Sequence, residues 1–226
     1  MTRQAAREYT DKPLYRISTI LYGVFGPTMC FLVACLPFAA AILLLPSAVT
    51  IAATGILIGP AWTALLYAVR VVAADRDRGP IAAFWHGYRV NARQTLAAWA
   101  PYWVLLVIAA ADASAPTVPL AVRWAVGIVA AVSLLWISSV LLLISGYAFR
   151  LRDILRLGLY LIFASPRMTL SNLALLVVAG ATVYFTSELL LGLLAGLFAV
   201  FAVLGARRGF ALIEERFTTP TAPAAG

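Results

Sequence analysis

Long apolar runs separated by short polar segments dominate the pattern of residues along the chain. About 20 apolar residues suffice for an α-helix to cross the hydrocarbon core of a bilayer, and the pattern contains six runs near or above this length. We therefore expect an all-α, polytopic membrane protein with six transmembrane helices. The expected spans are residues 17–45, 48–74, 96–111, 120–149, 168–186 and 189–206. Residues 1–217 then form a single six-helix transmembrane domain, and residues 218–226, rich in Pro, Ala and Thr, form a disordered tail.

The second expected span, 48–74, is longer than a bilayer crossing requires and contains Gly59-Pro60 near its middle. Pro60 has no N–H to donate to the carbonyl of Ile56, so we expect a kink or a discontinuity at this point. Gly55 and Gly59 also form a G-x-x-x-G step, which allows another helix to approach closely. Gly59 and Pro60 are therefore candidates for a helix break that either packs against neighbours or lines a cavity.

The two polar linkers after the second and fourth spans are expected to form cytoplasmic helices that lie in the membrane interface. In the first linker, apolar and aromatic residues recur at i, i+3, i+4 and i+7 from Ile81, while basic residues collect on another face. This pattern is typical of an interfacial helix with its aromatic side toward the membrane and its basic side toward water and phosphate. The candidate residues of this cytoplasmic interface, with one at the start of the fifth span, are Phe84, Trp85, His86, Arg89, Arg93 and Arg167.

The distribution of charge predicts how the spans are oriented. The chain is 63% hydrophobic and only 12% charged, which excludes an ordinary soluble protein. Of its 17 Lys and Arg residues, only Arg123 lies on the side that holds the loops after spans one, three and five. The positive-inside rule then places both termini in the cytoplasm. The net charge of +8 lies beside apolar runs, so it indicates contact with a lipid bilayer and not with nucleic acid.

The residues required for catalysis or metal binding do not form a recognisable set in the sequence. The centres of the spans contain no Asp, Glu, Lys or Arg, and His86 is the single histidine. We therefore expect no enzymatic activity, no cofactor and no metal. Trp99, Tyr102 and Trp103 are typical of core packing or of an interfacial aromatic belt, with stacking on a sugar ring as the alternative.

Two segments at the starts of spans three and five are similar to each other. Arg93-Gln94-Thr95-Leu96 and Arg167-Met168-Thr169-Leu170 lie 74 residues apart, and each follows a basic linker. An internal repeat of equal topology would place a pseudo-two-fold axis along the membrane normal. The alternative is that both segments are basic stops before apolar runs.

A longer motif surrounds the proline of the second span. Residues 58–67 are IGPAWTALLY, and they are followed by a charged linker that contains Phe84-Trp85 and, at 91–95, NARQT. This combination resembles the YesL-like family of bacterial integral membrane proteins, whose members carry a domain of unknown function. The resemblance covers roughly residues 14–106. It implies a six-helix protein of the bacterial cytoplasmic membrane that is encoded beside carbohydrate uptake and degradation systems.

Two functions are compatible with these observations. The first is a non-enzymatic membrane accessory protein that assists or regulates bacterial carbohydrate uptake, with a sugar ABC transporter or another membrane protein as its partner. The alternative is a small-molecule carrier or the substrate-binding membrane subunit of a larger transporter. A filled core beside Gly59-Pro60 favours the accessory protein, whereas a polar cavity there favours the carrier.

The predicted topology can be tested by cysteine labelling in a variant that lacks Cys30 and Cys35. A cysteine at Ser114 should react with a membrane-impermeant maleimide added to intact cells, because it follows the third span. A cysteine at Ala5 should react only after the cells are permeabilised. The reverse pattern would show that the termini lie outside.

Overall fold

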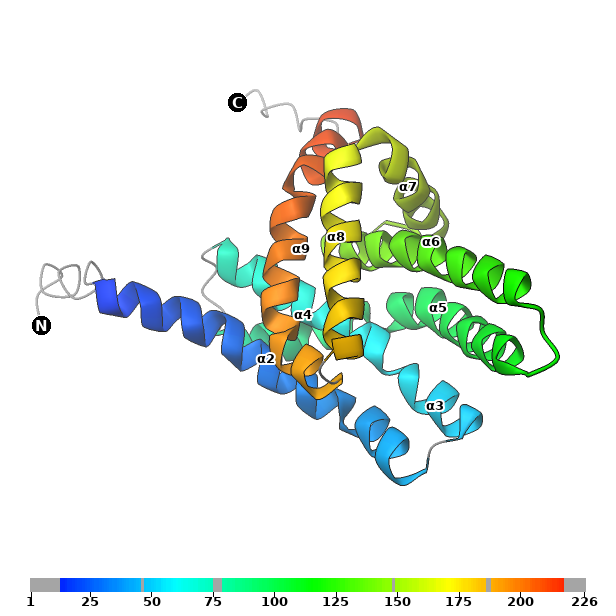
Figure 1. Cartoon of the computed structure of the whole chain (residues 1–226). Coiled ribbons are helices and arrows are strands. Elements are labelled where there is room, and N and C mark those ends of the chain that lie inside the picture. The colour runs from blue at the N-terminus through cyan, green and yellow to red at the C-terminus, as the bar shows by residue number, and fades with distance from the viewer. Residues whose placement is uncertain (1–12, 46, 75–78, 148, 186–187, 218–226) are drawn as a thin grey trace, which may run out of the picture.

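The computed structural model describes the backbone of residues 13–45, 47–74, 79–147, 149–185 and 188–217. Within these ranges the chain forms helices and no strand (Figure 1). The helices are α2 (Pro13–Leu44), α3 (Ala48–Gly55), α4 (Ile58–Ala73), α5 (Pro80–Ser114), α6 (Leu120–Ile144), α7 (Leu151–Ala164), α8 (Pro166–Phe185) and α9 (Glu188–Phe217). The expected disordered tail, 218–226, lies outside the described residues.

Six helical stretches in the described part of the chain are long and apolar enough to cross a membrane. They are Tyr22–Leu44, Ala48–Ala73, Pro80–Ser114, Leu120–Ile144, Pro166–Phe185 and Leu190–Arg207. The second of them combines α3 and α4. These stretches confirm the expected all-α, multi-pass membrane fold, because a periodic apolar run of bilayer length can satisfy its backbone only as a helix.

The first linker differs from its prediction. An interfacial helix followed by a separate span at 96–111 was expected, but α5 runs without interruption from Pro80 to Ser114, over 35 residues. Between Pro80 and Pro101 the sequence contains no proline, and arginines at 89 and 93 change the environment of a helix without ending it. At 1.5 Å per residue α5 is about 52 Å long, which exceeds the bilayer core of about 30 Å. About 22 Å of α5 therefore extends beyond the hydrocarbon, and Arg89 and Arg93 indicate that this is its N-terminal part.

The end of the fourth span also differs from its prediction. A span to residue 149 was expected, but α6 ends at Ile144. The N–H groups of Gly146 and Tyr147 both donate to the carbonyl of Leu143, and the guanidinium of Arg70 packs directly against Gly146. A Cβ at position 146 would collide with this guanidinium, so glycine leaves room for the arginine at the end of α6. The second linker then forms the expected separate helix, α7.

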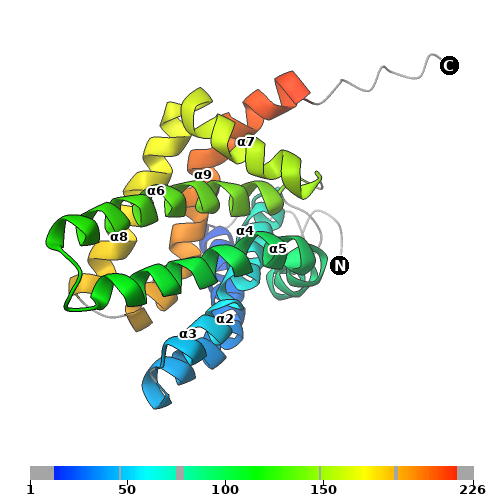
Figure 2. The ribbon, with the colours of Figure 1, turned by 90° about the vertical axis from the view of Figure 1, so that its right-hand side faces the viewer.

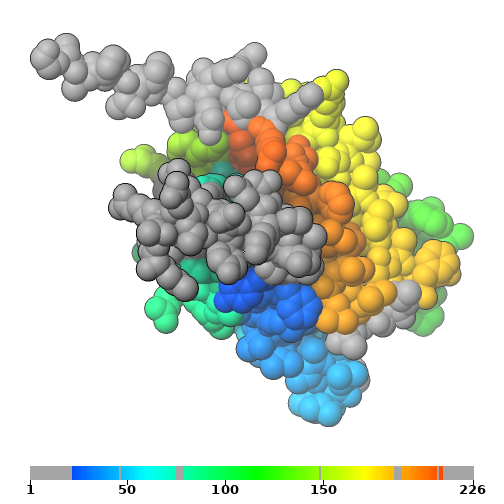
Figure 3. Space-filling view, turned by 90° about the vertical axis from the view of Figure 1, so that its left-hand side faces the viewer, coloured from blue at the N-terminus to red at the C-terminus, as the bar shows by residue number. Residues whose placement is uncertain are grey.

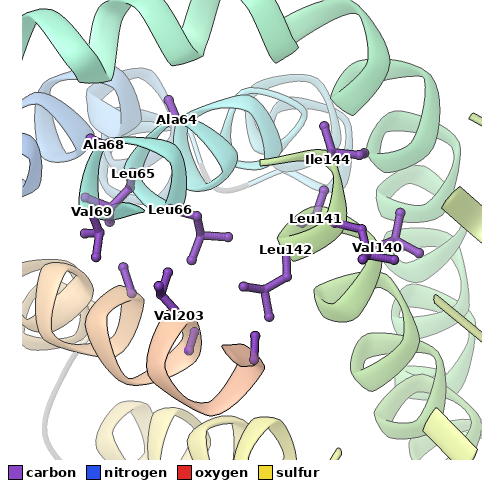
Figure 4. Packing of buried hydrophobic residues seen from close by; sticks show 14 of the residues in the cluster. Ala64, Leu65, Leu66, Ala68, Val69, Val140, Leu141, Leu142, Ile144 and Val203 are labelled. Atoms are coloured by element: carbon purple, nitrogen blue, oxygen red, sulfur yellow. The ribbon is translucent and has the colours of Figure 1, made fainter. Parts of the chain in front are cut away.

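Two helix pairs cross each other around α4. Figures 1 and 2 show α5 beside α6, and α8 beside α9 as a second pair that runs across the first. Helix α4 contacts α2, α5, α6 and α9. Figure 4 shows Leu66 of α4, Leu142 of α6 and Val203 of α9 pointing into the same space, and all three are buried. Since lipid tails are as apolar as leucine, close packing and not water exclusion holds such helices together.

Helix α9 uses glycines to approach two neighbours. Figure 3 shows α9 between α2 and α8 on one face of the molecule. A Cβ at Gly196 would collide with Thr28 of α2, and a Cβ at Gly205 would collide with Ser171 of α8. The small residues therefore allow backbone-close packing on both sides of one helix.

Candidate functional site

The break in the second span lies just before the proline that predicts it. Helix α3 ends at Gly55 and α4 begins at Ile58, which makes Pro60 the third residue of α4. The first N–H groups of a helix have no partner within that helix, so a proline in the first turn removes no helical hydrogen bond. The N–H of Leu57 donates to the carbonyl of Thr54 at 3.1 Å and closes a tight turn. Ile56 and Leu57 both keep right-handed helical backbone angles, so the helix break is a kink over these two residues and the backbone is not unwound there.

Two tryptophans of α5 provide the hydrogen-bond donors at this break. The indole Nε1 of Trp99 donates to the carbonyl of Gly55 at 3.0 Å, and that of Trp103 donates to the carbonyl of Ile51 at 3.3 Å. The two indoles stack, with ring centroids 5.6 Å apart and planes inclined by 18°. A carbonyl at the end of α3 that would lack a partner in lipid is therefore bonded within the protein.

Gly55 and Gly59 create the space that the indoles occupy. A Cβ at Gly55 would collide with the ring of Trp103, and a Cβ at Gly59 would collide with Trp99. Both pairs are four residues apart, so the two glycines share one helix face and the two tryptophans share the face that meets it. The G-x-x-x-G step predicts that the backbone of another helix approaches closely. In the structure the indole rings of Trp99 and Trp103 occupy this space instead. Gly59 and Pro60 are both buried.

From the sequence, Trp99 and Trp103 are expected to pack in the core, to form part of an interfacial aromatic belt or to stack on a sugar ring. The structure places them at the helix break, in the first of these roles. The matching four-residue spacing of Gly55/Gly59 and Trp99/Trp103 is the signal that could have paired them, but spacing alone does not reveal which helices face each other.

Polar side chains without a hydrogen-bond partner gather along the interface of α4 and α5. Thr63 and Thr95 are fully buried, and neither hydroxyl has a partner in the described part of the chain. The amide nitrogen of Asn91, one turn before Thr95, is also buried without a partner. Gly59 packs on Trp99 and Gly87 packs on Tyr67, and this register places Thr63 and Thr95 at the same level. These groups can donate or accept hydrogen bonds, but they carry no charge.

The expected cytoplasmic interface residues of α5 divide between its two faces. Phe84 is fully buried against the protein core, whereas Trp85 is 39% exposed. The rings of these two residues meet edge to face, with centroids 5.4 Å apart. His86, Arg89 and Arg93 are exposed. The buried aromatic side thus faces other helices of the protein, although the sequence pattern predicted that it would face the membrane.

Arg167 lies on a different element from Arg89 and Arg93. It is the second residue of α8 and is exposed. Arg123, the basic residue assigned to the opposite side, donates from Nη2 to the carbonyl of Ala115 at 2.8 Å in the loop between α5 and α6. The described residues contain no group of three His, Cys, Asp or Glu side chains placed to hold a metal ion.

Comparisons of the chain with protein-family models, with curated proteins and with solved structures find no match.

Replacing Trp99 with phenylalanine tests the role of the indole at the break. The Trp99→Phe variant keeps the aromatic ring but removes the donor to Gly55, so we expect a loss of roughly 1–2 kcal/mol in unfolding free energy. Trp124→Phe is the matched control, because Trp124 is 67% exposed on α6. Unfolding by titration with a denaturing detergent measures both. Equal stability of the two variants would contradict a structural role for the Trp99 hydrogen bond.

Proposed function

We propose that this chain is a non-enzymatic accessory protein of the bacterial cytoplasmic membrane that assists or regulates carbohydrate uptake. The observation that carries this proposal is the filled helix break in the second span. Carriers built around discontinuous helices use free backbone groups at the break to bind substrate or ions. Here the carbonyls of Ile51 and Gly55 accept hydrogen bonds from Trp103 and Trp99, whose rings also occupy the adjacent space.

The placement of charge supports a role at the membrane surface. His86, Arg89, Arg93 and Arg167 are exposed on helices whose apolar parts follow in the chain. Transport sites usually place ionisable groups at membrane depth, and the centres of these spans have none. Exposed cytoplasmic arginines and lipid-exposed small residues are suited to contact with another membrane protein. The link to carbohydrate uptake, and a sugar ABC transporter as the partner, come from the resemblance to YesL-like proteins.

A carrier, or the substrate-binding membrane subunit of a transporter, is the second candidate. The buried hydroxyls of Thr63 and Thr95 and the amide of Asn91 favour it, because a small polar solute would provide the partners they lack. These groups lie on α4, which begins at the break, and on α5, which donates the indole hydrogen bonds to it. The two candidates therefore differ in whether this interface holds a solute.

Substitution of Pro60 separates the two candidates. In an accessory protein, Pro60→Ala should leave the fold intact and maintain or raise the melting temperature, since Pro60 occupies the first turn of α4. A panel of mono- and disaccharides should then leave the melting temperatures of wild type and variant unchanged. A sugar that stabilises the wild type but not Pro60→Ala would favour the carrier.

Copurification tests the partner directly. We expect the full chain, purified from its native membrane in mild detergent, to bring down the membrane subunit of a sugar ABC transporter. Gly127→Leu on α6 and Gly180→Leu on α8 add bulk where no atom lies within 4 Å, so they should leave the fold intact. Loss of the transporter in either variant would locate the contact. Recovery of the chain with no second protein would contradict an accessory role.

A further inference from the structure

One hydrogen bond joins two cytoplasmic segments that are distant in the sequence. The side-chain Nε2 of Gln94 on α5 donates to the carbonyl of Phe149, between α6 and α7, at 2.7 Å. Each of these residues has an arginine as its direct neighbour, Arg93 on one side and Arg150 on the other. Both arginines are exposed, and Arg89 lies one turn before Arg93 on the same helix face. The hydrogen bond therefore places the backbone next to Arg150 beside the turn of α5 that carries Arg93.

The lengths of the helices place this group at the level of the lipid head groups. Between Arg93 and Asp112, α5 carries no charged residue, and the 18 intervening residues span about 27 Å as a helix. That length is close to the hydrocarbon thickness of about 30 Å. Helix α6 likewise has no charged residue between Arg123 and its end. Arg93 and Arg150 thus lie where the hydrocarbon ends.

Within the part of the chain that the structure describes, the charges of these arginines are not neutralised by an acidic side chain. Among the described residues, Arg89, Arg93 and Arg150 form no ion pair with a carboxylate. Asp153, in the first turn of α7, is the acidic residue closest to Arg150 in the sequence, and it is exposed. A cluster of exposed guanidinium groups at this depth is complementary to a phosphodiester, which accepts paired hydrogen bonds from arginine.

The face of α5 that carries Arg89 and Arg93 continues into the membrane as a stripe of small side chains. Ala97 and Pro101 follow Arg93 at intervals of four residues, and both are exposed. The stripe therefore changes from cationic at the head-group level to small and apolar below it. An amphiphile with an anionic head group and acyl chains is complementary to this stripe, because its head group would meet the arginines and its acyl chains the apolar residues below them.

We propose that Arg89, Arg93 and Arg150 bind the phosphate of an anionic phospholipid of the cytoplasmic leaflet, whose acyl chains lie along Ala97 and Pro101. Gln94 is a positioning residue, because its hydrogen bond holds the segment of Arg150 beside α5. The site differs from general surface charge in depending on this tertiary contact.

Binding of phosphatidylglycerol to the full chain in mixed micelles tests the site. The Arg93→Gln/Arg150→Gln variant should bind roughly 30-fold more weakly than the wild type, since the direct hydrogen bond of each arginine to the phosphate contributes about a fivefold factor. Arg156→Gln/Arg207→Gln is the matched control: it removes the same charge from exposed positions on α7 and α9 and should bind within about twofold of the wild type. Equal losses in both double variants would overturn the proposal in favour of diffuse charge.

Two further measurements identify the ligand and the positioning role. Gln94→Met removes the hydrogen bond without changing the charge and should weaken binding roughly fivefold. Phosphatidylcholine should bind more weakly than phosphatidylglycerol. Inorganic phosphate should not compete with phosphatidylglycerol for the site. Unchanged binding in Gln94→Met, or equal binding of phosphatidylcholine, would overturn the site as described. If inorganic phosphate competed, the ligand of this site would be a free anion and not a lipid.

Discussion

A backbone carbonyl inside a bilayer must find a donor within the protein, because lipid offers none and an unpaired group costs several kcal/mol. The arrangement of the second span follows from this constraint. The chain breaks between Gly55 and Ile58, and the indole N–H groups of Trp99 and Trp103 reach across from α5 to that region. The two glycines that let the rings approach are as necessary as the donors, since any side chain there would exclude the indoles.

The contact between α4 and α5 positions much of the remaining structure. With α5 fixed against the break, α4 becomes the helix that α2, α6 and α9 surround. Leu65 and Leu66 are fully buried as a result. The glycines of α9 then allow α2 and α8 to pack closely on either side of it. Small residues recur at these contacts because, in a membrane, van der Waals packing at short range replaces the hydrophobic effect as the force between helices.

Most of the charged residues that the structure describes lie away from this apolar core, whereas the guanidinium of Arg70 packs against Gly146 and lies 4.2 Å from the ring centroid of buried Phe210. The long helix α5 connects the core with the outer charged residues, because its C-terminal part holds the tryptophans that close the break and its N-terminal part carries Arg89 and Arg93 outside the hydrocarbon. A protein with a packed core and a cationic surface beside its apolar spans is suited to binding lipid and neighbouring proteins. Within this interior, the hydroxyls of Thr63 and Thr95 are buried polar groups that have no hydrogen-bond partner among the described residues.

The fold class, the number of apolar stretches and the position of the break to within a few residues could all be predicted from the sequence. These properties depend on run length, composition and the missing N–H of Pro60, all of which are local. The sequence pattern separated the first linker helix from the third span wrongly, because arginines mark a change of environment and not the end of a helix. The sequence did not predict that Trp99 and Trp103 pack at the break, nor that Gln94 donates a hydrogen bond to the carbonyl of Phe149. Both contacts are visible only in the tertiary structure. Such contacts depend on the rotation and register of whole helices against each other, and a one-dimensional pattern does not contain either quantity.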